Sequence, residues 1–100
     1  GETEESAKAK GIPYRVAKLP MTFAGRFVAE NEGGNGLCKI LVGEKHGEVI
    51  GVHMLGNPCS EIIYGACMAI EQEMTLEAMQ EVVFPHPTVS EIYKEVIFSF

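Results

Sequence analysis

Two runs of β-branched residues joined by a short turn constrain the fold of this chain more strongly than any other feature. The runs Leu37–Val42 and Glu48–Leu55 are separated by a segment that begins with Gly43 and ends with Gly47. This arrangement is typical of an antiparallel β-hairpin, because glycine lets the backbone reverse its direction. Alternate side chains of a strand share one face. We therefore expect these residues to face a core: Cys38, Ile40 and Val42 in the first run, and Ile50, Val52 and Met54 in the second.

Gly51 interrupts the second run of the hairpin. Glycine inside a strand marks either a β-bulge or the close approach of another backbone segment. The sequence leaves both alternatives open.

The residues before the hairpin predict a helix and a further strand. Gly1–Lys10 favours a helix that ends at Gly11 and Pro13, and Tyr14–Pro20 alternates like a short strand. The next residues, Met21–Glu30, are apolar but irregular, and they lead into a glycine-rich loop.

Three helices are expected after the hairpin. Asn57 and Pro58 have the order typical of an N-cap followed by the first helical residue. Thr75 can cap a short helix that ends at Gln80, and a final helix is expected from Val89. These elements together predict an α+β fold in which a small, mostly antiparallel sheet packs with helices.

The charge balance excludes several classes of partner. The chain has 8 Lys and Arg residues against 14 Asp and Glu residues, and its formal net charge is −6. Nucleic acids and anionic membranes both attract clustered positive charge, so we expect neither as a partner. No apolar run reaches the roughly 18 residues of a membrane span. The length of 100 residues predicts a single domain over residues 1–100.

The cysteines and two of the histidines have no spacing typical of a disulfide framework, a dithiol pair or a zinc site. Cys38, Cys59 and Cys67 are therefore expected as free thiols in a reducing compartment. Cys59 lies near a helix N-terminus that could lower its pKa, but packing is the favoured interpretation because no base is close. His46 is expected in a turn and His53 on a strand face, so no metal site is predicted.

The segment Pro85-His86-Pro87 carries the strongest indication of chemistry. Each proline disfavours the helical region for the residue before it, so His86 is held extended just before a helix. Rigid neighbours reduce the entropy lost when an imidazole is positioned for reaction.

Two interpretations of the residues after His86 remain open. In the first, Thr88 and Glu91 form a capping box, in which the Thr88 hydroxyl accepts from the Glu91 amide and the Glu91 carboxylate accepts from the Thr88 amide. In the second, the Glu91 carboxylate accepts from one ring nitrogen of His86 and makes the other nitrogen a better base. The first interpretation explains Thr88 and Glu91 but not His86.

The helices carry more apolar surface than one small sheet can cover. Tyr64, Tyr93, Phe98 and Phe100 are expected near helix surfaces. We expect a two-fold dimer, in which this apolar patch of one copy packs against the same patch of the other.

Six segments, in this order, resemble the C-terminal interface (dimerisation) domain of the pyridine nucleotide-disulfide oxidoreductases. They are Ala7–Ile12, Phe27–Ala29 before the glycine-rich loop, Leu37–Ile40, Gly47–Gly56 (GEVIGVHMLG), Ser60–Ile63 and His86–Glu91 (HPTVSE). The resemblance covers nearly the whole chain. Within the family it is strongest to the dihydrolipoamide dehydrogenases, flavin-dependent enzymes that reoxidise dihydrolipoamide with NAD.

The resemblance implies a catalytic role for the motif around His86. His86 resembles the acid-base histidine that acts on the redox cysteine pair of the other subunit, and Glu91 resembles the glutamate that orients it. The backbone of His86 and Pro87 resembles the stretch that approaches the flavin of the other subunit. The implied cofactors are FAD and NAD in the full-length enzyme, with none expected on this chain alone.

The implied partners are a second copy of the chain, the FAD and NAD domains of the same enzyme, and a lipoyl-bearing protein of a 2-oxoacid dehydrogenase complex. The implied location is the bacterial cytoplasm or, alternatively, the mitochondrial matrix. These residues contain no flavin domain and no redox-active cysteine pair, so the isolated chain is expected to be inactive. Phe84 and Pro85 depart from the small or polar residues expected before the histidine.

Two alternatives to this function remain. One is the interface domain of a related reductase of the glutathione reductase type, which shares the HPT motif and a following glutamate. The other is a freestanding α+β binding or assembly module in which Thr88 and Glu91 only cap a helix.

Overall fold

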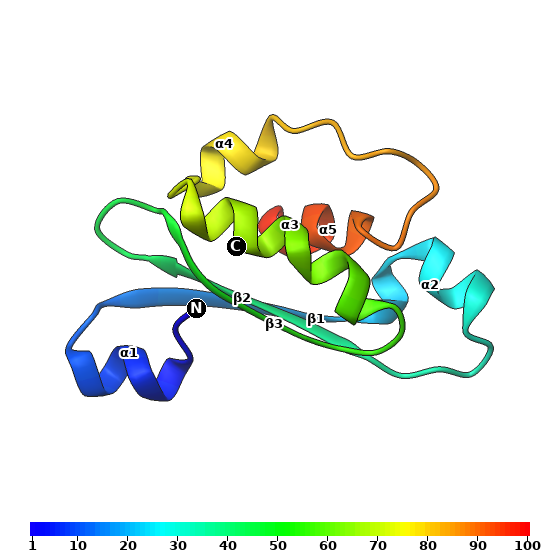
Figure 1. Cartoon of the computed structure of the whole chain (residues 1–100), viewed down its shortest axis with the longest axis horizontal. Helices are drawn as coiled ribbons and strands as arrows, with labels where there is room; N and C mark the ends of the chain where they lie inside the picture. The colour runs from blue at the N-terminus through cyan, green and yellow to red at the C-terminus, as the bar shows by residue number, and fades with distance from the viewer.

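The computed structural model describes all 100 residues, which form helices around a single small sheet (Figure 1). In chain order the elements are α1 (Glu4–Lys10), β1 (Tyr14–Pro20), the 3₁₀ turn η1 (Met21–Phe23), α2 (Gly25–Glu30), β2 (Leu37–Gly43), β3 (Val49–Leu55), α3 (Cys59–Glu71), α4 (Leu76–Gln80) and α5 (Glu91–Ile97). The strands are antiparallel in the order β1-β2-β3. The predicted α+β fold with a small antiparallel sheet is confirmed.

The two faces of the sheet are covered unequally. Helices α3, α4 and α5 lie on one side of the sheet, and α1 lies on the other (Figure 1). Helix α5 contacts β1 and β2, whereas α3 contacts β3. None of the helices combines the length and the hydropathy needed to cross a bilayer.

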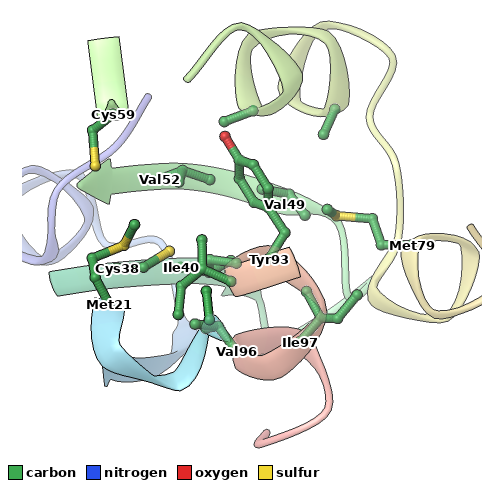
Figure 2. Packing of buried hydrophobic residues seen from close by; sticks show 14 of the residues in the cluster. Met21, Cys38, Ile40, Val49, Val52, Cys59, Met79, Tyr93, Val96 and Ile97 are labelled. Carbon is green, nitrogen blue, oxygen red and sulfur yellow. The ribbon is translucent and has the colours of Figure 1, made fainter. Parts of the chain in front are cut away.

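The main core lies between the sheet and the layer of α3 and α5. Cys38, Ile40 and Val42 are fully buried, as the strand periodicity predicts. Figure 2 shows Ile40 of the sheet in the same cluster as Tyr93 and Val96 of α5. The Tyr93 hydroxyl points toward α3, where it donates to the Ile62 carbonyl at 2.7 Å. This buried hydrogen bond ties α5 to α3 across the core.

A β-bulge between β2 and β3 changes which residues face the core. Val42 pairs with Val49 rather than with Ile50, while Leu41 pairs with Gly51. Val49 is consequently 2% exposed and belongs to the core, whereas Ile50 is only half-buried. The prediction for Ile50 was therefore wrong, because one extra residue in a strand reverses the side-chain alternation beyond it.

The sequence left open whether Gly51 marks a β-bulge or the close approach of another backbone segment. Both are present, since Gly51 adjoins the bulge and lies against the N-terminal residues. A side chain at Gly51 would collide with the Glu2 carbonyl. The same Glu2 donates its amide to the Ile50 carbonyl at 2.8 Å and accepts from the His53 ring at 2.8 Å. Glycine thus allows the N-terminal residues to lie against β3.

Helix α1 is attached to the second face of the sheet. The Glu4 carboxylate accepts from Lys39 of β2 at 3.0 Å and from the Tyr14 hydroxyl at 3.2 Å. Ala7 of α1 and Leu41 of β2 are both fully buried. The predicted N-terminal helix is therefore docked by a small apolar contact with an ion pair at its edge.

The irregular segment after β1 forms η1 and α2, which the sequence did not predict. Met21, Ala24 and Phe27 of this segment are buried in the main core. Such short helices are stabilised by packing rather than by intrinsic propensity, so local sequence patterns give little sign of them.

Helix boundaries agree with the prediction at α4 and differ at α3. The Thr75 hydroxyl caps α4 by accepting from the Ala78 amide at 3.1 Å. At α3, Pro58 is the N-cap, and the Asn57 side chain donates to Asn31 instead of capping the helix.

The terminal helix α5 begins at Glu91, two residues later than predicted. Val89 and Ser90 form a turn before it, in which the Glu91 and Ile92 amides donate to the Thr88 and Val89 carbonyls. This tighter turn delays the regular α-helix.

Candidate active site

His86 and Glu91 lie on either side of the turn that opens α5. His86 belongs to the irregular segment between α4 and α5, while Glu91 is the first residue of α5. The helix is held in place by Ile92, Val96 and Ile97, each of which is fully buried. The core therefore fixes the position of Glu91, and the loop brings His86 to it.

The imidazole of His86 contacts the Glu91 carboxylate directly. Its Nδ1 lies 3.0 Å from Oε1 and 2.9 Å from Oε2 of Glu91. A carboxylate can only accept, so Nδ1 carries the proton and Nε2 of the neutral ring keeps its lone pair. The His86 side chain is 78% exposed, whereas that of Glu91 is 11% exposed. The free nitrogen thus belongs to an imidazole open to a partner, and the pairing carboxylate is sheltered.

Glu91 also performs part of the capping role. Its Oε2 accepts from the Thr88 amide at 3.0 Å. The Thr88 hydroxyl does not complete the box, because it donates to the Pro85 carbonyl at 2.8 Å. The Glu91 amide donates instead to the Thr88 carbonyl at 3.3 Å. The two interpretations of the motif are therefore compatible, and only the carboxylate half of the capping box is present.

Hydrogen bonding keeps the Glu91 carboxyl ionised. The Thr88 amide, followed by the His86 ring, lowers the pKa of Glu91 from its ordinary value of 4.5, although partial burial acts in the opposite direction. Lys94, one turn further along α5, adds a weaker attraction with its Nζ 3.7 Å from Oε1. A carboxylate that stays charged can orient the imidazole and stabilise its protonated form.

The main chain around His86 is open as well. No hydrogen bond within the domain uses the amide or the carbonyl of His86. The Pro87 carbonyl accepts from Nη1 of Arg26 at 3.2 Å. Sequence reasoning missed Arg26, because it lies 61 positions from Pro87 and belongs to no motif around the histidine.

The remaining histidines and cysteines are spread over the fold. His46 is exposed in the turn after β2, and the ring of His53 bonds to the Glu2 carbonyl. No three His, Cys, Asp or Glu side chains are arranged so that they could hold a metal ion.

The three thiols are free and have no base beside them. Burial raises the pKa of Cys38 to about 12 and also raises that of Cys59. Cys59 is therefore a packing residue, as favoured from the sequence. Cys67 is exposed on α3.

An apolar groove lies beside the active-site loop. It has a volume of about 170 Å³ and is lined by Gly65, Ala69, Met74, Met79, Val82, Phe84 and Tyr93. The elements that line it carry further exposed apolar side chains: Tyr64 and Met68 on α3, and Val83 on the loop. We call the groove and these side chains the apolar surface.

The expectation of exposed aromatic residues was correct only in part. Tyr64 and Phe98 are 68% and 59% exposed, but Tyr93 is buried in the core. Phe100 is half-buried, with the Arg15 guanidinium 5.4 Å from its ring centre.

The sequence of this chain is similar to that of known proteins. Residues 1–97 match the family described as "Pyridine nucleotide-disulphide oxidoreductase, dimerisation domain". The dihydrolipoyl dehydrogenase of Rhizobium etli is 38% identical over 97 residues, which are 97% of this chain and 20% of that protein. The mitochondrial dihydrolipoyl dehydrogenase 1 of Arabidopsis thaliana is 37% identical over 95 residues, covering 95% of this chain and 18% of that protein. The chain thus spans about a fifth of the length of these curated relatives.

A solved structure shares the fold. The HOCl-induced flavoprotein disulfide reductase RclA from Escherichia coli superimposes with a TM-score of 0.88 at 24% identity, over 98% of this chain and 22% of that one. Together with the family match over residues 1–97, the curated relatives decide the assignment. The chain belongs to the dimerisation-domain family of the pyridine nucleotide-disulphide oxidoreductases.

Proposed function

We propose that this chain is the interface domain of a dihydrolipoamide dehydrogenase, in which His86 acts as the acid-base residue for dithiol oxidation at the redox disulfide of the partner subunit. The observation that carries this proposal is the contact between His86 Nδ1 and the Glu91 carboxylate, which leaves Nε2 free on an exposed ring. The curated relatives named dihydrolipoyl dehydrogenase support the choice of substrate.

In this function His86 accepts and returns protons between thiols. The neutral Nε2 takes the proton of one dihydrolipoamide thiol, and the thiolate that forms attacks the redox disulfide of the partner subunit, which gives a mixed disulfide and one enzyme thiolate. The imidazolium returns the proton to that thiolate. Nε2 then takes the proton of the second substrate thiol, whose thiolate attacks the mixed disulfide, closes the lipoamide disulfide and releases the second enzyme cysteine as a thiolate. The Glu91 carboxylate stabilises the imidazolium between these steps.

When bound, FAD would supply the remaining redox chemistry, the transfer of an electron pair from the reduced cysteines to NAD. The chain's own contribution is an exposed stretch at His86 and Pro87, whose open main chain fits a close approach to the flavin of the other subunit. The chain bends at His86 and Pro87, so the extended conformation expected there from the two prolines is not formed.

We also propose that a second copy of the chain docks on the apolar surface. Phe84 lines the groove and His86 follows it after a single proline, so the docking surface and the imidazole share one segment. Docking at the groove would therefore bring His86 to the partner subunit. The Val83 side chain is 89% exposed. Exposed apolar side chains that lie together are typical of a protein interface.

The proposal includes the rest of the enzyme. Residues 1–100 would form one interface domain, with FAD and NAD domains belonging to the same enzyme outside these residues, and a lipoyl-bearing protein of a 2-oxoacid dehydrogenase complex would deliver the substrate. Bacterial and mitochondrial relatives support the bacterial cytoplasm or the mitochondrial matrix as its location.

The orientation of the His86 ring tests the proposal in this chain itself. At about pH 9, where imidazole is neutral, ¹⁵N NMR of the ring nitrogens should show a proton on Nδ1. Glu91→Gln should populate both tautomers, because an amide can accept from one and donate to the other. Glu95→Gln, a neighbouring exchange on α5, should leave the Nδ1 proton in place.

A ring protonated at Nε2 in the unchanged chain would contradict the proposal. The same is true of a tautomer that Glu91→Gln does not alter, because Glu91 would then not orient the ring.

A further inference from the structure

The loop that carries His86 has few attachments to the rest of the domain. No main-chain amide from Val83 to Ser90 donates to a main-chain carbonyl. The side-chain hydrogen bonds of His86 and Thr88 reach only Glu91 and Pro85, which belong to the same stretch of chain. Because Glu91 belongs to the anchored helix α5, its bonds hold His86 and Thr88 against the start of that helix.

Arg26 makes the one hydrogen bond that connects residues 83–90 to a distant part of the chain. Its Nη1 donates to the Pro87 carbonyl at 3.2 Å, and its Nε lies 2.8 Å from Oε2 of Glu30. The planar guanidinium thus binds a carboxylate and a carbonyl simultaneously, which holds the group in one orientation.

The helix that carries Arg26 is anchored in the core. Ala24 and Phe27, on either side of Arg26, are each only 1% exposed. The Asn31 side chain closes the end of α2 by donating to the Phe27 carbonyl at 3.0 Å. Arg26 therefore projects from an anchored helix toward the Pro87 carbonyl.

Packing holds the two ends of the loop, since Val89 belongs to the core and Phe84 packs against it, but it leaves a space next to Pro87. An open hollow of about 240 Å³ lies beside the contact, lined by Arg26, Glu30, Pro58, Ile62, Pro87, Thr88, Val89 and Ser90. Across this open space, the Arg26 to Pro87 hydrogen bond connects α2 to the loop.

We propose that Arg26 is a positioning residue for His86. By fixing the Pro87 carbonyl it fixes the Pro87–Thr88 peptide unit, one residue beyond His86, and so the direction in which Nε2 faces the partner subunit. This inference rests on the proposed function, since it assigns Arg26 a role only if His86 transfers protons there. Displacement of a reacting group by about 1 Å can reduce turnover about a hundredfold.

The test compares Arg26→Gln and Arg26→Lys with Arg15→Gln in the complete flavoenzyme that carries this domain. Arg15 is the matched control, because it is the other arginine of the chain and stacks on Phe100 instead. Arg26→Gln should lower kcat for dihydrolipoamide about tenfold or more, with KM within about twofold of its original value. Arg26→Lys should recover part of kcat, because an ammonium can donate to Pro87 without the second, orienting bond.

A second readout follows the loop itself in this 100-residue chain. In Arg26→Gln the ¹⁵N order parameters of the His86 and Thr88 amides should fall from about 0.85 toward 0.6. Arg15→Gln should leave them unchanged.

The outcomes separate this inference from the proposed function. If His86→Gln retains normal turnover, the acid-base role fails, whatever Arg26 does. If His86→Gln is inactive while Arg26→Gln keeps its kcat and its order parameters, the positioning role is overturned and the acid-base role stands. Loss of flavin or of the dimer in Arg26→Gln, with kcat per bound flavin unchanged, also overturns it.

Discussion

The Glu91 carboxylate accepts hydrogen bonds both from the amide at the start of α5 and from the imidazole of His86. Its Oε2 accepts from the Thr88 amide, and both of its oxygens lie within hydrogen-bond distance of His86 Nδ1. The hydrogen bond from the Thr88 amide is the largest cause of the lowered pKa of Glu91. The same bond that caps the helix therefore keeps the carboxylate beside His86 charged. Structural and chemical roles therefore support each other at this position.

The depressed pKa of Glu91 predicts a pH dependence of stability. The unfolded chain takes up a proton at the ordinary value of 4.5, but the folded chain does so only at lower pH. The contribution of Glu91 to the free energy of unfolding is therefore complete above pH 4.5, and it is lost as the pH falls through the pKa of Glu91 in the folded chain. The difference in stability to urea between the wild-type chain and Glu91→Gln should be larger at about pH 6 than at about pH 3.

Glu2 and Glu4 also have lowered pKa values, so both chains lose stability in acid, and only the difference between them reports on Glu91. A difference that stays constant between the two pH values would show that the folded chain does not hold Glu91 ionised.

At the level of elements, α3 and the segment after α4 together form the apolar surface. Gly65 and Ala69 are small enough to leave a groove on α3, while Val82 and Phe84 form its other wall. The neighbouring side chains Tyr64, Met68 and Val83 are exposed. No element of the domain covers this surface, which makes it the docking face that we propose for a second copy.

Val83→Lys tests that docking face. Val83 is 89% exposed, so the folded domain should tolerate the charge, but a buried lysine in the interface should weaken the dimer about tenfold or more. Leu55→Lys is the matched control, because Leu55 is 70% exposed at the end of β3, outside the groove. Sedimentation velocity of the complete flavoenzyme at several concentrations gives both dissociation constants.

Weakening of the dimer by Leu55→Lys but not by Val83→Lys would move the interface to another face. Equal dimer strength in all three proteins would remove the apolar surface from the interface altogether.

The elements that were predictable depend on local signals. The period-two pattern of β2 places Cys38, Ile40 and Val42 in the core without knowledge of their neighbours, and Thr75 caps α4 through a bond within three residues. The burial of Val49 in place of Ile50 in the core was not predictable, because the bulge depends on how two strands pair.

The candidate site follows the same rule. His86 and Glu91 were found because their contact spans five positions around one turn. Arg26 reaches the same loop across 61 positions, so only the folded chain connects them. Helix α2, which carries Arg26, was missed for a related reason, since its stability comes from Phe27 in the core.

For the whole molecule, the fold separates a packed body from the exposed loop that carries His86. The sheet with α3 and α5 forms the core, and the stretch between α4 and α5 extends from it as an exposed connection (Figure 1). That connection carries Phe84 at the groove and His86 beyond it. A dimer formed at the groove would then share one reaction between two chains, in agreement with a domain family named for dimerisation.

The most direct test of the acid-base role is the reduction of bound flavin by dihydrolipoamide in a complete flavoenzyme carrying His86→Gln. This half-reaction should slow by about 10²–10⁴-fold, the usual contribution of a general acid-base residue. Turnover of NADH with a quinone acceptor should persist, because hydride transfer to flavin and reoxidation by the quinone need no proton from a thiol. His46→Gln, a change at the exposed turn histidine, serves as the control and should leave both reactions unchanged.

Flavin content and dimer mass of His86→Gln should equal those of the unchanged enzyme. Rapid flavin reduction by dihydrolipoamide in His86→Gln, at the rate of the unchanged enzyme, would contradict the assignment of His86 as the acid-base residue.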